Sequence, residues 1–156
     1  MGTNYYFRKK SINPARIEAI VDSLNNDYKA LVEKYNEKLH DAFSAMGLDS
    51  EYEFDNSQTF FLPDSSETYG DIHVGKLSYG WKPLLQANKH FHSIQTLKQW
   101  YEQNKHDYNL IDEYDETVQF DEFIREIAER NQNDDLEEHR HRKDSEGYDW
   151  SHTKFS

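Results

Sequence analysis

Apolar residues recur at steps of three and four from Ile17 to Met46, and this spacing constrains the fold more than any other feature of the sequence. The steps place these residues on one face of an α-helix of about nine turns. Asn13 can accept hydrogen bonds from the first free amides, Pro14 suits a first turn and Gly47 suits a helix end. We therefore expect one amphipathic helix over residues 14–46, which either packs within the domain or binds a partner.

Glycines, aromatic residues and β-branched residues concentrate in one stretch, residues 71–81. Ile72 and Val74 alternate with polar residues as in a strand, and Gly75 and Gly80 indicate a bulge or a close backbone approach. We expect this stretch, through Trp81, to be the central strand of a small sheet.

Shorter patterns flank this strand. Residues 3–8 are a short aromatic stretch that we expect to be a strand. Residues 51–55 alternate acid and aromatic as in a strand, with Tyr52 and Phe54 facing inward. Helical spacing follows Ser93 and recurs over residues 120–130. The order of elements predicts an α+β fold: a small, mainly antiparallel sheet packed by the long N-terminal helix and two shorter C-terminal helices. No internal repeat is expected.

The length of 156 residues and the composition predict three segments. Residues 1–132 are expected to form a single α+β domain. Residues 133–146 are polar and charged and read as a linker. Residues 147–156 contain three aromatic side chains, so we expect this C-terminal segment to dock on the domain.

The chain has no cysteine, which excludes disulfides, thiolate catalysis and cysteine-ligated zinc. No apolar run approaches the ~18 residues of a membrane span, and the N-terminus lacks the apolar core of a signal peptide. We expect an intracellular protein that does not contact membranes and needs no cofactor.

The formal net charge of −12 comes from two segments. Eight Asp or Glu and no Lys or Arg lie between Lys38 and Lys76, and seven more acids lie between Lys105 and Arg125. Phosphate contacts need clustered basic residues, so direct nucleic-acid binding is not expected. An acidic surface instead favours a basic partner, although acidic surfaces also serve solubility alone.

Alternating acids on an extended chain lie about 6.6 to 6.8 Å apart, close to the spacing of backbone phosphates along one strand of nucleic acid. We therefore predict that the protein occupies the basic groove of a nucleic-acid-binding enzyme. The predicted partner-binding residues are Glu51, Glu53, Asp55, Asp112, Glu113, Asp115 and Glu116.

An alternative hypothesis is a metal-dependent enzyme whose metal ligands are Asp71, His73, His90 and His92. The spacing is weak support, because a histidine that donates to a backbone carbonyl is the more common case. No catalytic motif, and therefore no catalytic residue, is predicted. A third reading is a structural or regulatory homodimer that forms through residues 14–46.

Three segments also resemble a family of small, mostly uncharacterised phage and prophage proteins. They are residues 1–6 (MGTNYY), residues 73–81 (HVGKLSYGW) and the ending from Glu146-Gly147-Tyr148 to Phe155-Ser156. Relatives often carry a cysteine-rich segment where this chain has its helix-forming stretch. The resemblance implies no activity. Together with the two acidic segments, the resemblance leads us to expect an inhibitor in the host cytoplasm that occludes the basic surface of a host defence factor, such as a CRISPR effector or a restriction enzyme.

Overall fold

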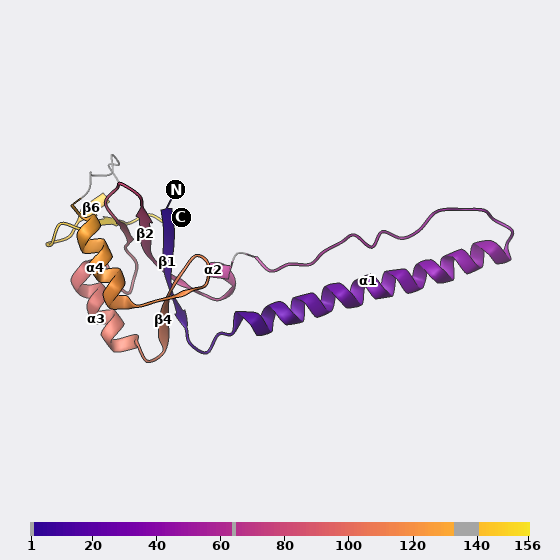
Figure 1. The fold of residues 1–156 in the computed structure, drawn as a ribbon, viewed down its shortest axis with the longest axis horizontal. Helices are drawn as coiled ribbons and strands as arrows, with labels where there is room; N and C mark the ends of the chain where they lie inside the picture. The colour runs from indigo at the N-terminus through magenta and orange to yellow at the C-terminus, as the bar shows by residue number, and fades with distance from the viewer. Residues whose placement is uncertain (1, 64, 133–140) are drawn as a thin grey trace. The chain divides into compact units, whose positions relative to one another are not determined.

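The computed structural model describes every residue except 1, 64 and 133–140. In chain order the elements are β1 (Gly2–Lys9), α1 (Pro14–Ala45), α2 (Ser65–Thr68), β2 (Ile72–Ser78), β3 (Leu84–Gln86), α3 (Ile94–Asn104), β4 (Tyr108–Asp112), β5 (Thr117–Val118), α4 (Phe120–Arg130), β6 (His141–Lys143) and β7 (Asp149–Ser151) (Figure 1). Helices and a mostly antiparallel sheet confirm the α+β class.

The chain divides into two compact units where one domain was expected over residues 1–132. Residues 1–12 and 64–156 form the sheet unit, and residues 13–63 form a second unit that we call the arm. The division arises because contacts of residues 13–63 cluster within that segment. Each unit is described by itself.

The sheet unit contains one seven-stranded sheet in the order β5-β4-β1-β2-β3-β7-β6. Neighbouring strands are antiparallel except β3 and β7, which are parallel. β2 lies in the middle, which confirms the prediction for residues 71–81. The strand ends at Ser78 rather than at Trp81, because Gly80 adopts a φ of 81° in a turn. The Trp81 N–H closes this turn by donating to the Ser78 carbonyl over 3.2 Å.

Gly75 is the point at which β2 comes closest to its neighbour β3. A Cβ atom on Gly75 would lie 2.7 Å from the carbonyl oxygen of Leu84, closer than side chains tolerate. The register of the β1–β2 pair also shifts here, since Tyr5 pairs with Gly75 and Tyr6 with His73. The predicted bulge and the predicted close approach therefore coincide at this glycine.

The two shorter helices, α3 and α4, occur where predicted and cover one face of the sheet (Figure 1). Phe7 of β1 packs between them, with ring centroids 4.8 Å from Trp100 of α3 and 6.2 Å from Phe120 of α4. Ser93 caps α3 through a reciprocal pair of hydrogen bonds with Thr96. The core of the sheet unit therefore lies between the sheet and these helices.

The C-terminal residues join the sheet as the hairpin β6–β7, and buried Trp150 pairs with Leu85 of β3. Asp144 holds the hairpin to α3, because its Oδ2 accepts from the Ile94 N–H (2.8 Å) and from Trp150 Nε1 (2.9 Å). Residues 133–140 of the expected linker lie outside the described residues, whereas 141–146 form β6 and a turn. Within residues 147–156, β7 pairs with β3, and the Phe155 ring lies 4.7 Å from the His73 ring.

In the arm, α1 begins and ends as predicted. The Asn13 side chain accepts a hydrogen bond from the Arg16 N–H, Pro14 opens the first turn, and Gly47 follows the helix with a φ of 71°. Residues 49–63, which we call the return segment, form neither helix nor strand. The strand predicted over residues 51–55 is therefore wrong: this segment has no strand partner, and Tyr52 and Phe54 are 62% and 46% exposed.

Two asparagine side chains of α1 hold the return segment. Asn36 Nδ2 donates to the Phe54 carbonyl (3.0 Å), and the Phe54 N–H donates back to Asn36 Oδ1 (2.6 Å). Asn25 makes the same pair of bonds with Phe60, at 2.9 and 2.7 Å. Each side-chain amide thus takes the place that a neighbouring strand's peptide group has in a sheet.

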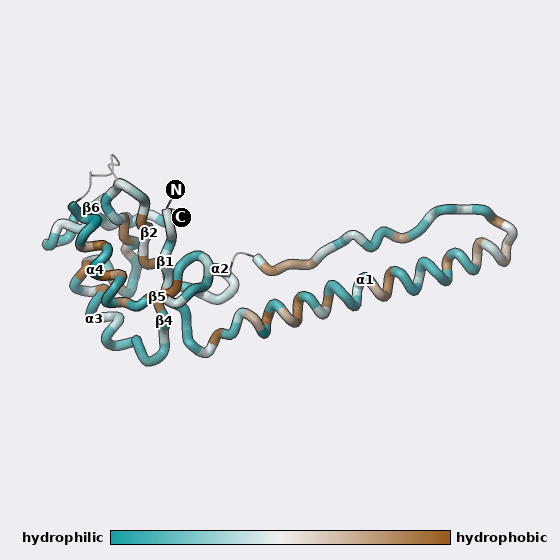
Figure 2. Tube along the Cα trace, viewed as in Figure 1, coloured by the Kyte–Doolittle hydropathy of each residue, from teal (hydrophilic) through white to brown (hydrophobic). Residues whose placement is uncertain are grey.

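The asparagines expose an 11-residue repeat in α1, which corrects the expectation of no repeat. Asn25 and Asn36 are one repeat apart, and so are the apolar pairs Ile17–Tyr28, Val21–Val32, Ile20–Leu31 and Leu24–Tyr35. Eleven residues make about three helical turns, so equivalent residues return to nearly the same face. Figure 2 shows the resulting recurrence of apolar colour along α1.

None of the described helices is both long enough and apolar enough to cross a membrane.

Candidate functional site

The acidic segment 112–116 is the turn between β4 and β5. Asp112 organises this turn, because its Oδ1 accepts from the backbone N–H groups of Tyr114 (2.8 Å) and Glu116 (3.0 Å). The chain can reverse here since Asp115 adopts a φ of 64°. Asp112 is therefore a structural residue of the hairpin.

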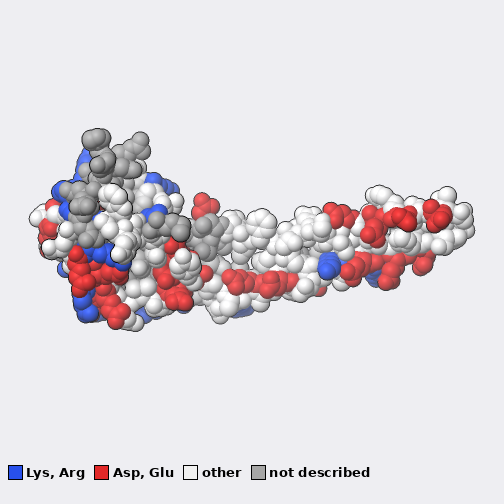
Figure 3. Space-filling model, turned by 45° about the horizontal axis from the view of Figure 1, so that its top comes forward, with Lys and Arg blue, Asp and Glu red and all other residues white. Residues whose placement is uncertain are grey.

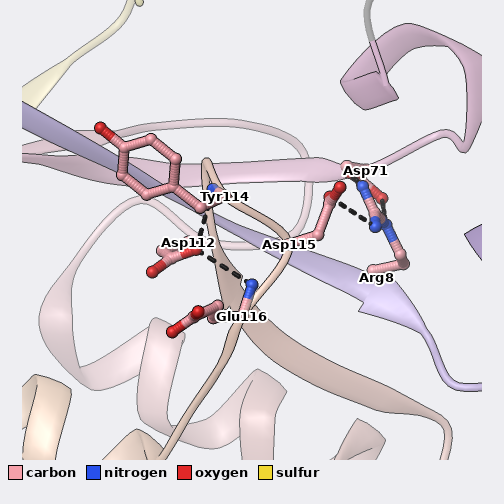
Figure 4. A network of polar contacts seen from close by, with 6 residues as sticks. All are labelled: Arg8, Asp71, Asp112, Tyr114, Asp115 and Glu116. Carbon is pink, nitrogen blue, oxygen red and sulfur yellow. Dashed lines mark hydrogen bonds and ion pairs between the residues drawn. The ribbon is translucent and has the colours of Figure 1, made fainter.

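Asp115, whose side chain is 41% exposed, belongs to an ionic network with the buried side chains of Arg8 and Asp71 (Figure 4). Arg8 donates through Nε and Nη2 to the Asp71 carboxylate, at 2.9 and 2.6 Å, and through Nη1 to Asp115 at 2.8 Å. The side chains of Arg8 and Asp71 are only 6% and 1% exposed. The hydrogen bonds to Asp71 raise the pKa of Arg8 further, and the guanidinium stays charged.

Two of the four acids predicted in this turn therefore stabilise the fold of the sheet unit. Glu113 and Glu116 are exposed, and the Glu116 carboxylate points away from Arg8 (Figure 4). Asp115 is exposed as well, but its carboxylate is paired with Arg8, so Glu113 and Glu116 are the two exposed acids of the turn that Arg8 does not hold.

In the arm, Glu51, Glu53 and Asp55 are all exposed on the return segment. Asp55 Oδ1 accepts from the Ser57 N–H over 2.8 Å, and hydrogen bonds from Ser57 lower the pKa of Asp55. Figure 3 shows that acidic side chains recur along the arm, where 10 Asp or Glu stand against 4 Lys or Arg.

Glu53 also lies at an open hollow of about 490 Å³ whose other acidic lining residues come from α1. These residues are Glu33, Glu37 and Asp41, and His40 lies among them. Their spacing of four residues places Glu33, Glu37 and Asp41 on one helix face, and this spacing is a signal present in the sequence itself. We call this feature the acidic hollow.

The two acidic segments belong to different units, and each is considered within its own unit. The arm gathers four carboxylates around one hollow, whereas the turn of the sheet unit exposes three, of which Asp115 is paired with Arg8. The acidic hollow is therefore the stronger candidate for a site that binds a basic group.

Of the four residues predicted for a metal site, Asp71 and His73 lie at the start of β2, and His90 and His92 lie in the loop between β3 and α3. Asp71 is held by Arg8, and His73 Nε2 lies 3.0 Å from Asn4 Oδ1. His73 and His90 line one hollow of about 760 Å³, which does not include His92. Among the residues that the structure describes, no three His, Cys, Asp or Glu are placed to hold a metal ion.

We expect the stability of the sheet unit to depend on pH through His73. Burial lowers the pKa of His73 below its usual value of about 6.5, and hydrogen bonds with Gln86 and with the Gly75 backbone partly oppose this effect. The unfolded chain then binds the proton more readily, so the free energy of unfolding is largest above about pH 6.5 and falls as the pH drops towards the pKa of the folded state. Urea unfolding across this range should show the decline.

The variant His73→Gln keeps a donor towards Asn4 and removes the titration, so it should reduce the decline. The exposed His92, changed to Gln in the same way, is the control and should leave the decline unchanged. A decline of wild-type size in His73→Gln would contradict the assignment.

The fold and the acidic hollow define the class: an α+β protein whose sheet unit carries an acidic helical arm. The chain matches no known protein family, no curated protein and no solved structure. The resemblance to phage and prophage proteins therefore stays a prediction.

Proposed function

We propose that this protein is a non-enzymatic binding protein whose arm covers the basic, nucleic-acid-binding surface of another protein. One observation carries the proposal: Glu33, Glu37, Asp41 and Glu53 surround a single open hollow on the arm. A Lys or Arg side chain that enters the hollow meets carboxylates from both α1 and the return segment. Opposite charges arranged in this way speed encounter and select the partner.

Carboxylates of the return segment could take the place of the backbone phosphates of a nucleic acid. The Asn36 and Asn25 side chains each make two hydrogen bonds to the backbone of Phe54 and Phe60, respectively. These bonds hold the return segment in a fixed path along α1. Glu51, Glu53 and Asp55 are exposed on this held segment. A surface that evolved to bind successive phosphates would accept such a row of carboxylates, and inhibition would be by stoichiometric occlusion.

The resemblance to phage and prophage proteins suggests the biological setting. In that setting the partner is a host defence enzyme that acts on nucleic acid, of the CRISPR effector or restriction type, and the protein works in the host cytoplasm. Nucleic acid itself is not a ligand, because the acidic arm repels phosphate.

The test compares two variants that change the net charge equally. Glu37→Lys with Glu53→Lys reverses charge at the acidic hollow, and Glu113→Lys with Glu116→Lys does so at the turn of the sheet unit. The tagged proteins, checked for unchanged helix content, capture partners from a bacterial lysate that contains defence systems. We expect the wild type and the turn variant to retain a nucleic-acid-binding enzyme and the hollow variant to bind it at least about tenfold more weakly.

Two further measurements on the captured enzyme decide the mechanism. Added DNA or RNA should compete with this protein for the enzyme, and binding should weaken steeply as salt rises. Equal capture by both variants, no competition by nucleic acid, or a shallow salt dependence would each refute occlusion by the arm.

A further inference from the structure

A second apolar stripe of α1 is left uncovered by the return segment. The half-buried face contains Ile17, Val21, Tyr28, Val32, Leu39 and Phe43. The uncovered stripe contains Ile20, Leu24, Leu31, Tyr35 and Met46, which are 60%, 49%, 52%, 50% and 66% exposed, together with the small residue Ala42. We call this set the exposed stripe. It runs for roughly 39 Å of helix, which is too long and too regular for scattered surface residues.

The exposed stripe and the acidic hollow lie on different faces of α1. Glu37 follows Tyr35 by two residues, which is roughly 200° around the helix. An occupant of the stripe therefore leaves the hollow accessible, and an inference about the stripe does not depend on the proposed function.

The spacings along the exposed stripe read the same in both directions. From Ile20 to Met46 they are four, seven, four, seven and four residues. When two copies of α1 lie antiparallel, Ile20 of one copy meets Met46 of the other, Leu24 meets Ala42, and Leu31 meets Tyr35. Every member of the stripe then finds an apolar counterpart. The 11-residue period keeps the seam on one face of nearly straight helices.

The charges beside the stripe fit the same arrangement. Asp27 lies one turn after Leu24, and Lys38 lies one turn after Tyr35 with its Nζ 5.1 Å from the Tyr35 ring centroid. In the antiparallel register Asp27 of one copy faces Lys38 of the other, within one residue of the same level. The twofold axis repeats this pair, so the dimer gains two opposite-charge contacts. If the two helices were parallel and in register, Asp27 would instead lie level with Asp27 of the other copy, and Lys38 with Lys38.

We propose that two copies of this chain dimerise through the exposed stripes of their arms, with the α1 helices antiparallel. The palindromic spacing and the Asp27–Lys38 complementarity select a second copy over an unrelated apolar partner. The interface buries Leu31 and Tyr35 nearest the twofold axis and leaves the acidic hollow of each arm open, so the dimer presents two hollows.

The first test is the mass of the full chain in solution by sedimentation equilibrium over a wide range of concentration. We expect a dimer that dissociates on dilution, and Leu31→Asp should raise its dissociation constant at least about tenfold, because the aspartate would be buried at the centre of the interface. Leu48→Asp is the matched control, since Leu48 is 55% exposed and lies outside the stripe. A monomer at all concentrations, or equal weakening by Leu48→Asp, would overturn the proposal.

The second test fixes the orientation and does not depend on folding of the Leu31 variant. The chain has no cysteine, so single cysteines report position without interference. A mixture of Ile20→Cys and Met46→Cys chains should form the mixed disulfide, whereas Ile20→Cys alone should not form a disulfide dimer. Efficient self-linking of Ile20→Cys would show parallel helices and overturn the antiparallel assignment.

A charge exchange gives a further criterion. Asp27→Lys and Lys38→Asp should each weaken the dimer, and the double variant should regain most of the affinity because the pair is restored with opposite sign. Additive weakening in the double variant would remove this pair from the interface and contradict the proposed register.

Discussion

Replacing Arg8 by methionine is expected to lower the free energy of unfolding of the sheet unit by about 3 to 5 kcal/mol. Methionine fills much of the same space but leaves the Asp71 carboxylate, 1% exposed, without its guanidinium partner. A buried charge without its counter-ion is among the most destabilising changes that a single substitution makes. Urea unfolding followed by tryptophan fluorescence measures the loss, because Trp100 and Trp150 both lie in this unit.

The double variant Arg8→Met with Asp71→Asn separates the lost ion pair from lost packing. Because it removes the stranded charge, it should be more stable than Arg8→Met alone. Arg125→Met changes an exposed arginine of α4 in the same way and should shift stability by no more than about 0.5 kcal/mol. If Arg8→Met were as mild as Arg125→Met, the network would have no role in the stability of the sheet.

Asn36→Ala is expected to release the return segment, at a local cost of about 2 to 3 kcal/mol. Asn36 is the only buried residue within residues 13–63, all of which the structure describes, and it provides both bonds to Phe54. Alanine removes the donor and the acceptor together. Amide hydrogen exchange at Phe54 measures the effect directly, and its protection should fall roughly thirtyfold or more.

Two variants control for the helix itself. Asn26→Ala, on an exposed position of α1, should leave exchange at Phe54 unchanged. Asn36→Asp keeps an acceptor for the Phe54 N–H but cannot donate to the Phe54 carbonyl, so it should fall between the wild type and Asn36→Ala. Wild-type protection of Phe54 in Asn36→Ala would mean that the apolar contacts hold the segment without the asparagine.

Local signals predicted the helices and the central strand because those signals act within a few residues. The Asn13-Pro14 start, the apolar spacing and Gly47 fixed the extent of α1, and Gly75 marked the close approach between strands. The strand predicted within the return segment was wrong for a physical reason. Its alternation described an extended chain, but its hydrogen-bond partners are the Asn25 and Asn36 side chains, and residue alternation does not reveal the partner.

The candidate site was less predictable because it depends on contacts between distant residues. Arg8 is separated from Asp71 by 63 residues and from Asp115 by 107, and no local pattern signals such an ion pair. Asp115 consequently looked like an ordinary surface acid, although it is also a counter-ion of Arg8. The spacing of Glu33, Glu37 and Asp41 predicts that these acids share one face of α1. That Glu53 lies at the same hollow could not be predicted, because it depends on the path of the return segment along α1.

The arm is an insertion between two strands that are neighbours in the sheet, since β1 pairs directly with β2. A short turn in place of residues 13–63 would join the same strands and would reduce the entropy lost on closing the connection by roughly 2 kcal/mol. Closing the connection between β1 and β2 therefore costs more entropy with the arm present than with a short turn. A connection of this kind can lengthen, shorten or be exchanged while the strand order stays the same, which makes the arm the part of the molecule free to diversify.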